Sequence, residues 1–228
     1  MINHRYHEPL EISQTDWKRA DITLDKQKQA LNIFNQPVMQ QWEQNFMQKL
    51  ANIATSRGGN ILEIGFGLGL SFSQIQRNKI HKHVIIEANE QVYETISSQN
   101  KNKTILLESH CQFWQEVIPN LPNQYFDGIL YDTYPSSKKD LHTHQFDFLK
   151  QAKRILKPTG LITYCNLTSW GNLRRYYNND NECFNKTQRP FIHEIGFSNV
   201  SYEIVNVNPP NDCEYYSFNT AVAPLIQF

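Results

Sequence analysis

The stretch that decides the fold runs from Ile61 to Gly69 and reads Ile-Leu-Glu-Ile-Gly-Phe-Gly-Leu-Gly. Its largely apolar first half predicts a buried strand, and the glycines that follow predict a turn at which the backbone can approach a ligand. A second apolar run, His83–Ile86, follows at the distance typical of a strand-helix-strand unit. The sequence therefore predicts an α/β fold built on a parallel sheet.

Further short apolar runs continue this alternation toward the C-terminus. An apolar stripe that ends at Leu156 predicts a helix covering the sheet, and we expect Lys157–Gly160 to stop it and start a turn. An Asn-Pro-Pro loop suits an antiparallel connection between the last two strands. We expect a single Rossmann-like domain with a seven-stranded, mostly parallel sheet, an antiparallel last strand and helices on both faces. The predicted strands are Asn60–Ile64, His83–Ile86, Thr104–Leu107, Phe126–Tyr131, Leu161–Cys165, Val200–Val207 and Glu214–Val222.

The chain ahead of the first strand divides near residue 36. Apolar residues recur at helical spacing after Pro37, which predicts a core-facing helix that begins there. This stripe consists of Met39, Trp42, Phe46, Leu50 and Ile53. Residues 1–36 have no such period, and we interpret them as an arm or lid over the domain formed by residues 37–228.

Composition excludes several classes of protein. The 228 residues carry 22 Lys+Arg against 22 Asp+Glu, so no broad charge favours nucleic acid or an anionic membrane surface, and small-molecule partners become the expectation. The first thirty residues contain no apolar signal segment and no apolar run is long enough to span a bilayer, so we expect a cytoplasmic protein. The four widely spaced cysteines are expected to be reduced, buried thiols. Monomer and homodimer both remain open.

The glycine turn and the end of the next strand predict a cofactor site. Glu87 stands 22 positions after Gly65, where a carboxylate can accept hydrogen bonds from two hydroxyls of an unphosphorylated ribose. The GxGxG spacing and the acidic Glu63 favour S-adenosylmethionine, because a carboxylate there can attract the cationic methionine end. A solvated or N-cap-paired Glu63 is the alternative. Trp114 lies where an adenine would bind, or else packs in the core.

Two further acids are candidates for chemistry. Met39, Glu43 and Met47 are four residues apart and would share one face of the predicted helix, although a solvated glutamate beside packed methionines gives the same pattern. Asp132 follows the fourth strand at the point where doubly wound sheets bind ligands.

Two pairs of basic residues have simpler interpretations than a ligand site. His142 and His144 have metal-ligand spacing, but we expect capping and packing and predict no metal site. Arg174 and Arg175 could attract a substrate carboxylate, although a solvent-facing helix explains them as well.

Three stretches carry a specific resemblance. Tyr125–Pro135 reads Tyr-Phe-Asp-Gly-Ile-Leu-Tyr-Asp-Thr-Tyr-Pro, residues 142–146 read His-Thr-His-Gln-Phe, and residues 161–171 read Leu-Ile-Thr-Tyr-Cys-Asn-Leu-Thr-Ser-Trp-Gly. Together with Pro37–Met39, Trp42-Glu43, Leu62–Gly67, Ile85–Glu87 and Asn89, they closely resemble the guanidinoacetate N-methyltransferase family. The resemblance extends from about Pro37 to Leu225, and the Tyr-Asp-Thr-Tyr-Pro and Cys-Asn-Leu-Thr-Ser-Trp-Gly segments are far more specific than a glycine turn.

The resemblance implies a class I methyltransferase fold and methyl transfer from S-adenosyl-L-methionine to guanidinoacetate, a reaction of creatine biosynthesis that also gives S-adenosyl-L-homocysteine. It implies that Glu43 and Asp132 hold the guanidinium with help from Met39 and Trp17, and that Leu167 and Thr168 lie at the substrate carboxylate. Combined with the glycine-turn argument, the expected cofactor residues are Trp17, Met47, Glu63, Gly65, Phe66, Gly67, Leu68, Gly69, Leu70, Ser71, Glu87, Ala88, Asn89, Trp114, Gln115 and Asp132.

Two carboxylates suit this chemistry because a guanidinium is planar and presents paired N–H donors. The attacking nitrogen must lose a proton, and we expect Asp132 to accept it as the carbon–nitrogen bond forms. Two alternatives stay open. One is methylation of another guanidine, either free arginine or a protein arginine, and the other is a catalytically silent domain that only binds S-adenosylmethionine.

Overall fold

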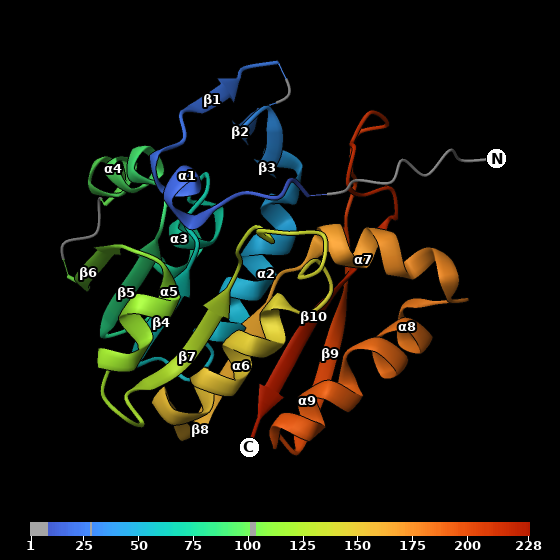
Figure 1. Cartoon of the computed structure of the whole chain (residues 1–228). Coiled ribbons are helices and arrows are strands. Elements are labelled where there is room, and N and C mark those ends of the chain that lie inside the picture. The colour runs from blue at the N-terminus through green and yellow to red at the C-terminus, as the bar shows by residue number, and fades with distance from the viewer. Residues whose placement is uncertain (1–8, 28, 101–103) are drawn as a thin grey trace.

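The fold is built on a seven-stranded sheet, seen in a computed structural model that describes residues 9–27, 29–100 and 104–228 (Figure 1). The strand order is β6-β5-β4-β7-β8-β10-β9. Neighbours from β6 to β8 are parallel, whereas β10 runs antiparallel to both β8 and β9. This confirms the predicted sheet and its antiparallel last strand. The strands are β4 (Asn60–Ile64), β5 (Lys82–Glu87), β6 (Leu106–Cys111), β7 (Phe126–Tyr131), β8 (Leu156–Tyr164), β9 (Asn199–Asn206) and β10 (Thr220–Gln227).

Three strands differ from the predictions by more than one residue at an end. The last strand begins at Thr220, because the apolar Tyr215 and Tyr216 pack beside Trp42 in the loop before it. The third strand, β6, lies later than predicted. Residues 157–160 do not form the predicted turn, since β8 begins directly after the helix and widens into a bulge against β7.

Helices cover both faces of the sheet, as expected. In Figure 1, α2 lies behind the strands while α6 and α9 lie in front. Fully buried side chains such as Phe46 from α2 and Phe148 from α6 belong to the main core cluster. The helices of this domain are α2 (Gln44–Ala54), α3 (Leu70–Ile75), α4 (Glu90–Gln99), α5 (Trp114–Val117), α6 (His144–Ile155), α7 (Leu167–Leu173), α8 (Asp180–Thr187) and α9 (Arg189–Ile195), with the short 3₁₀ turns η1 (Gln41–Glu43), η2 (Ile118–Asn120) and η3 (Arg174–Tyr176).

The N-terminal region contains structure of its own. Helix α1 (Gln14–Arg19) precedes a small antiparallel sheet of β1 (Ile22–Asp25), β2 (Ala30–Ile33) and β3 (Gln36–Gln40), while residues 1–8 and 28 of the predicted arm lie outside the described residues. The predicted helix start at Pro37 is wrong, because Pro37 belongs to β3 and pairs with Asn32 of β2. The helical chain begins only after Gln40. Met39 therefore lies on a strand, Glu43 in η1 and Met47 in α2.

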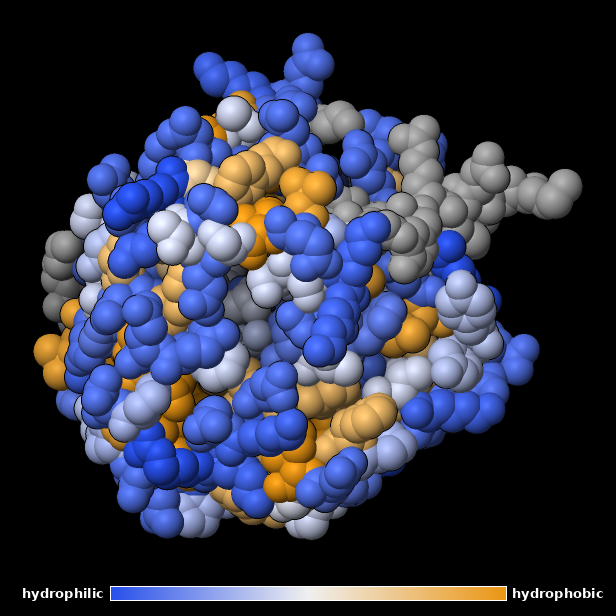
Figure 2. Space-filling view, in the orientation of Figure 1, coloured by the Kyte–Doolittle hydropathy of each residue, from blue (hydrophilic) through white to orange (hydrophobic). Residues whose placement is uncertain are grey.

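The outer surface of the molecule is mostly hydrophilic on the face shown in Figure 2, with hydrophobic residues in separate patches. No helix of the described residues combines the length and the apolar character needed to cross a membrane.

Candidate functional site

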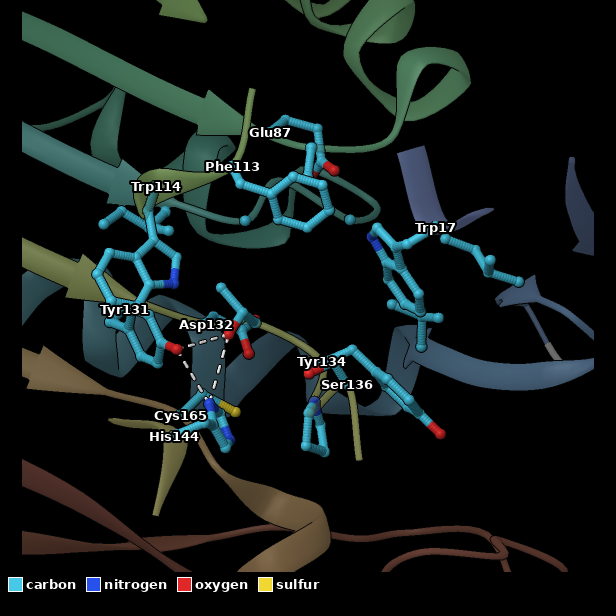
Figure 3. A pocket seen from close by; sticks show the side chains of 18 of the residues that line it. Trp17, Glu87, Phe113, Trp114, Tyr131, Asp132, Tyr134, Ser136, His144 and Cys165 are labelled. Carbon is cyan, nitrogen blue, oxygen red and sulfur yellow. Dashed lines mark hydrogen bonds between the residues drawn. The ribbon is translucent and has the colours of Figure 1, made fainter. Parts of the chain in front are cut away.

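A cavity of about 380 Å³ opens at the carboxyl ends of the central parallel strands (Figure 3). Gly65 follows β4, Glu87 ends β5, Asp132 follows β7 and Cys165 follows β8, so adjacent strands deliver all four to one edge of the sheet. The chain adds strands in one direction from β4 and in the other direction from β7, so the strand order reverses between these two strands. Sheets of this type bind ligands in the crevice at that point, beyond the carboxyl ends of the strands. The sequence therefore assembles a pocket where the topology favours one.

The turn after β4 depends on its first glycine. Gly65 has a φ of +84°, a conformation that side-chain-bearing residues rarely adopt. A Cβ at this position would also collide with the carbonyl oxygen of Asp132. The same turn is closed from the other side by Met39, whose sulfur accepts a hydrogen bond from the Leu68 N–H at 3.3 Å.

Glu87 is held at the end of β5 by backbone donors. Its two carboxylate oxygens accept hydrogen bonds from the N–H groups of Phe66 and Asn89, each at 2.8 Å. Burial raises the pKa of Glu87, and these backbone bonds partly offset that effect. The N–H groups of Gly67 and Ala88 also act on this carboxylate, so backbone donors hold it at the edge of the cavity that it lines.

Glu43 reaches the opposite side of the pocket from η1. Its Oε1 accepts a hydrogen bond from the Gln40 N–H at 2.7 Å and another from the Tyr215 hydroxyl at 2.5 Å. Burial raises its pKa to about 8, and the charge of Asp132 adds to the rise against the effect of the two hydrogen bonds. This carboxyl is therefore largely protonated at neutral pH unless a cation binds beside it.

Asp132 is the second acid of the pocket whose pKa is raised. Burial, Glu63 and Glu87 raise its pKa to about 6, against a hydrogen bond with the Cys165 thiol that lowers it. Two carboxyls with raised pKa values in one pocket form a site suited to a planar cation, because such a ligand stabilises both in their charged forms.

Helix α1 covers this pocket. The Trp17 ring stacks on Tyr134, with centroids 5.2 Å apart, and the Asn89 side chain donates to the carbonyl oxygens of Trp17 at 3.0 Å and Ala20 at 2.8 Å. The Ile12 N–H donates to the Ser136 carbonyl at 3.1 Å. The N-terminal segment is thus tied to the strand ends on two sides of the opening.

The structure brings most of the predicted site residues to this pocket. The predicted residues that line it are Trp17, Met39, Glu43, Gly65, Gly67, Glu87, Ala88, Trp114, Gln115, Asp132, Leu167 and Thr168. The predicted residues outside the lining are Met47, Glu63, Phe66, Leu68, Gly69, Leu70, Ser71 and Asn89.

The residues outside the lining support the pocket from behind. Met47 and Phe66 are fully buried in the two core clusters. The Glu63 carboxylate accepts a hydrogen bond from Ser71 and lies 3.0 Å from Nε2 of the equally buried His83, which places it beneath the glycine turn. Glu63 is therefore fully buried and not solvated, and it lies behind the cavity and not in its lining.

Several pocket residues were not predicted from the sequence. Tyr131, Tyr134, His144, Cys165 and Tyr215 all line the cavity. The first four lie within the three stretches that carry the family resemblance, so their sequence neighbours signalled the site. Tyr215 gave no such signal, because it was assigned to the last strand.

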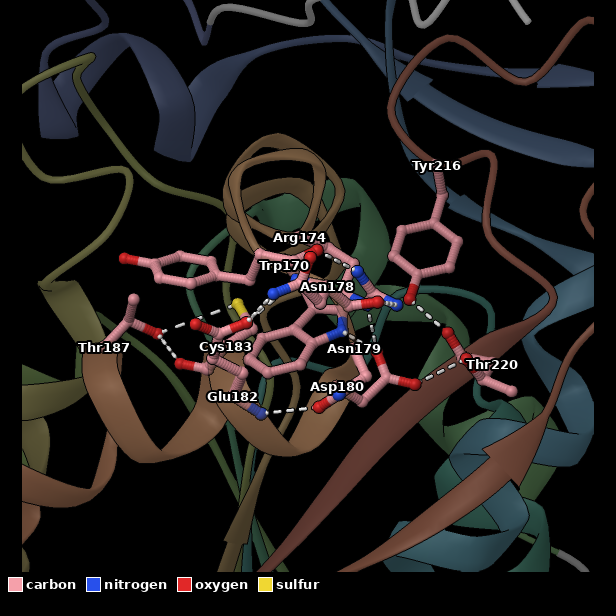
Figure 4. A network of polar contacts seen from close by, with 11 residues as sticks. Trp170, Arg174, Asn178, Asn179, Asp180, Glu182, Cys183, Thr187, Tyr216 and Thr220 are labelled. Atoms are coloured by element: carbon pink, nitrogen blue, oxygen red, sulfur yellow. Dashed lines mark hydrogen bonds and ion pairs between the residues drawn. The ribbon is translucent and has the colours of Figure 1, made fainter.

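Arg174 is committed to a structural network (Figure 4). Its Nε donates to Asp180 at 2.9 Å, and the same carboxylate accepts from Trp170 and Thr220. The remaining guanidinium groups donate to the backbone carbonyls of Tyr177 and Asn178. Arg174 therefore braces the C-terminal helices and does not line the pocket.

The two histidines of the His-Thr-His stretch also have local partners. His142 Nδ1 lies 2.7 Å from the Ser169 hydroxyl, and His144 Nδ1 lies 3.0 Å from the Tyr131 hydroxyl. Among the residues that the structure describes, no group of three or more His, Cys, Asp or Glu side chains could hold a metal ion. All four cysteines are free, and Cys111 is the one that is only half-buried.

Comparison with solved structures supports the fold. The spermidine synthase of Thermotoga maritima superposes with a TM-score of 0.64 at 16% sequence identity, over 96% of this chain and 72% of that one. A spermidine synthase in complex with the transition state analogue AdoDATO gives a TM-score of 0.62, also at 16% identity, over 96% of this chain and 72% of that one. At such low identity the likeness concerns the fold.

Comparison of sequences is more specific. Protein arginine N-methyltransferase 2 of Yarrowia lipolytica is 31% identical over 209 residues, or 86% of this chain, and the protein of the same name in Saccharomyces cerevisiae is 29% identical over 57% of this chain. The matched regions make up only 41% and 32% of those two proteins. The family model of guanidinoacetate N-methyltransferase matches residues 6–227. The chain therefore belongs to the guanidinoacetate N-methyltransferase family.

Proposed function

We propose that the protein transfers a methyl group from S-adenosyl-L-methionine to a guanidino nitrogen of guanidinoacetate. The observation that carries this proposal is the pairing of Glu43 and Asp132 in one pocket. Burial raises the pKa of both carboxyls, and the negative charges of neighbouring acids add to the rise, Asp132 acting on Glu43 and Glu63 and Glu87 acting on Asp132. No Lys or Arg lines the described part of the cavity to neutralise them, which leaves this role to a cationic ligand.

The residues at the glycine turn fit the proposed cofactor. Gly65 and Gly67 line the cavity with positive φ angles, Glu87 presents its carboxylate where ribose hydroxyls would lie, and Trp114 and Gln115 line the wall expected for an adenine. When bound, S-adenosylmethionine would supply an electrophilic methyl group on a sulfonium. The surplus of carboxylates favours that positive charge as well.

The two acids would have different tasks. Glu43 holds the guanidinium in a fixed orientation through an oxygen that Tyr215 and the Gln40 N–H already position. Asp132 holds the attacking nitrogen and accepts its proton as the carbon–nitrogen bond forms. A free guanidinium is too weak an acid to lose this proton beforehand, so proton transfer accompanies bond formation.

Residues 1–36 would act as the lid of this site. Trp17 and its stacking partner Tyr134 line the cavity, so α1 can exclude water from the reacting groups. At the far side of the cavity, Leu167 and Thr168 in the first turn of α7 would receive the substrate carboxylate.

A second candidate substrate is arginine, free or in a protein. The relatives named protein arginine N-methyltransferase 2 favour it, and a guanidinium would be held by the same two acids in either case. The two candidates differ in what is attached to the guanidino group, so activity can separate them.

The test is methyl transfer from radiolabelled S-adenosylmethionine to guanidinoacetate, free arginine and an arginine-containing peptide, with the product identified by mass spectrometry. We expect creatine from guanidinoacetate. Preferential labelling of arginine or of the peptide would replace guanidinoacetate as the substrate. No labelling of any guanidine, with S-adenosylmethionine bound, would support a silent binding domain.

A further inference from the structure

The two residues that flank Asp132 are joined by hydrogen bonds that the proposed mechanism does not use. The Thr133 hydroxyl donates to the Tyr131 hydroxyl at 2.8 Å, and the Tyr131 oxygen lies 3.0 Å from Nδ1 of His144 at the start of α6. Figure 3 shows the contact between Tyr131 and His144 near Asp132. The neighbours of the proposed proton acceptor therefore converge on one histidine.

The direction of these bonds follows from counting protons. The Tyr131 oxygen accepts hydrogen bonds from Thr133 and from the Trp114 side chain. Its own proton is then directed to Nδ1 of His144, which must be an unprotonated acceptor. Burial lowers the pKa of His144 to about 4, so the imidazole stays neutral near pH 7 and the arrangement persists.

The network lies where the backbone leaves the sheet. The Asp132 N–H donates to the Ile64 carbonyl and the Cys165 N–H donates to the Tyr131 carbonyl, both at 2.8 Å, which fixes the backbone up to Asp132. Thr133 lies beyond the end of β7, and its side chain links it back to Tyr131. The backbone on both sides of Asp132 is thereby restrained.

We propose that Tyr131, Thr133 and His144 are positioning residues, which hold the backbone on both sides of Asp132 and so place its carboxylate where it accepts the substrate proton. The inference rests on the proposed function, because it assumes that Asp132 is the acceptor. If the backbone that carries Asp132 can shift, its carboxylate spends less time within hydrogen-bond reach of the attacking nitrogen, so turnover falls while ligand binding is less affected.

The first test is Thr133→Val, which removes the hydroxyl at nearly constant volume. We expect kcat on the guanidine substrate to fall about tenfold or more, with the Kd of S-adenosylhomocysteine unchanged. The Asp132 pKa, measured by ¹³C NMR of labelled aspartate, should fall from about 6 toward its ordinary value, because a loosened carboxylate becomes better hydrated. The groups that face it, Cys165, Glu63, Glu87 and Glu43, are unchanged in this variant.

Two variants serve as controls. Thr133→Ser keeps the hydroxyl and should restore both kcat and the Asp132 pKa. Thr163→Val removes the hydroxyl of a threonine on β8 that is buried and has no hydrogen-bond partner among the described residues, so it should leave both quantities unchanged. If Thr133→Val does not fold, Tyr131→Phe tests the same network and keeps the ring stacked on Phe148.

The outcomes separate the network from the function. Wild-type kcat and an unshifted Asp132 pKa in Thr133→Val would overturn the proposal, and so would equal losses in Thr133→Val and Thr163→Val. If the wild-type protein methylates no guanidine, the proposed function fails, and the NMR titration still decides whether the network positions Asp132.

Discussion

Among single residues, Asp132 has the role in the mechanism that a substitution tests most directly. Asp132→Asn keeps the shape and one acceptor oxygen but cannot take up a proton. We expect kcat to fall by about 100-fold, the loss typical of a removed general base, while the Kd of S-adenosylhomocysteine stays nearly constant. Steady-state kinetics and calorimetry measure the two quantities, and near-normal turnover on every guanidine would exclude Asp132 as the acceptor.

Glu43 should give a different kinetic signature. Glu43→Gln keeps an oxygen for the bonds from Tyr215 and the Gln40 N–H but loses the charge that grips the guanidinium. We expect the KM for the guanidine to rise, together with a fall in kcat smaller than that of Asp132→Asn. A larger effect on kcat than in Asp132→Asn would reverse the roles assigned to the two acids.

The sequence revealed these residues unevenly. Asp132 could be found because a carboxylate at the end of a parallel strand, beside the point where strand order reverses, almost has to face the ligand crevice. Glu43 lines the cavity together with Met39, but not on the one helix face that the spacing predicted, since Met39 lies on β3 and the helical chain begins after Gln40. Tyr215 could not be found, because a tertiary contact with Glu43 across 172 positions leaves no local pattern.

At the scale of elements, α1 is the segment whose docking can be tested. Asn89 both caps α4, by accepting from the Val92 N–H, and donates to the carbonyls of Trp17 and Ala20. Asn89→Ser keeps a capping oxygen and loses the two donors, each worth about 1 kcal/mol. We expect hydrogen exchange to become faster in residues 14–20 and to stay unchanged in the central strands.

Ligands should act on α1 in the opposite direction. If α1 closes over the site, S-adenosylhomocysteine together with a guanidine should slow hydrogen exchange in residues 14–20 of the wild-type protein. Equal exchange with and without ligands would instead indicate a permanently docked segment.

The elements of the sheet were easier to predict than those outside it. Central strands such as β4 and β7 are buried on both faces, so continuous apolar runs mark them at their true bounds. The N-terminal strands are short, partly exposed and paired with one another, and β3 contains a proline, so no periodic pattern identified them.

At the scale of the whole molecule, the two acids should destabilise the ligand-free protein as the pH rises. Folding raises the pKa of Glu43 from 4.5 to about 8 and that of Asp132 from 3.8 to about 6, so the folded state binds more protons than the unfolded state between these values. Stability therefore falls with rising pH in these windows. Below about pH 6.5, His144, whose pKa folding lowers from 6.5 to about 4, has the opposite effect.

The clearest window thus lies between about pH 6.5 and pH 8, where Glu43 dominates. We expect the free energy of unfolding, measured by urea denaturation, to decrease across this range in the wild type and to stay nearly flat in Glu43→Gln. The exposed Glu94→Gln serves as the matched control and should keep the wild-type slope. If the free energy of unfolding changes with pH equally in the wild type and in Glu43→Gln, Glu43 ionises normally. The pairing of two carboxyls with raised pKa values would then no longer argue for a cationic substrate.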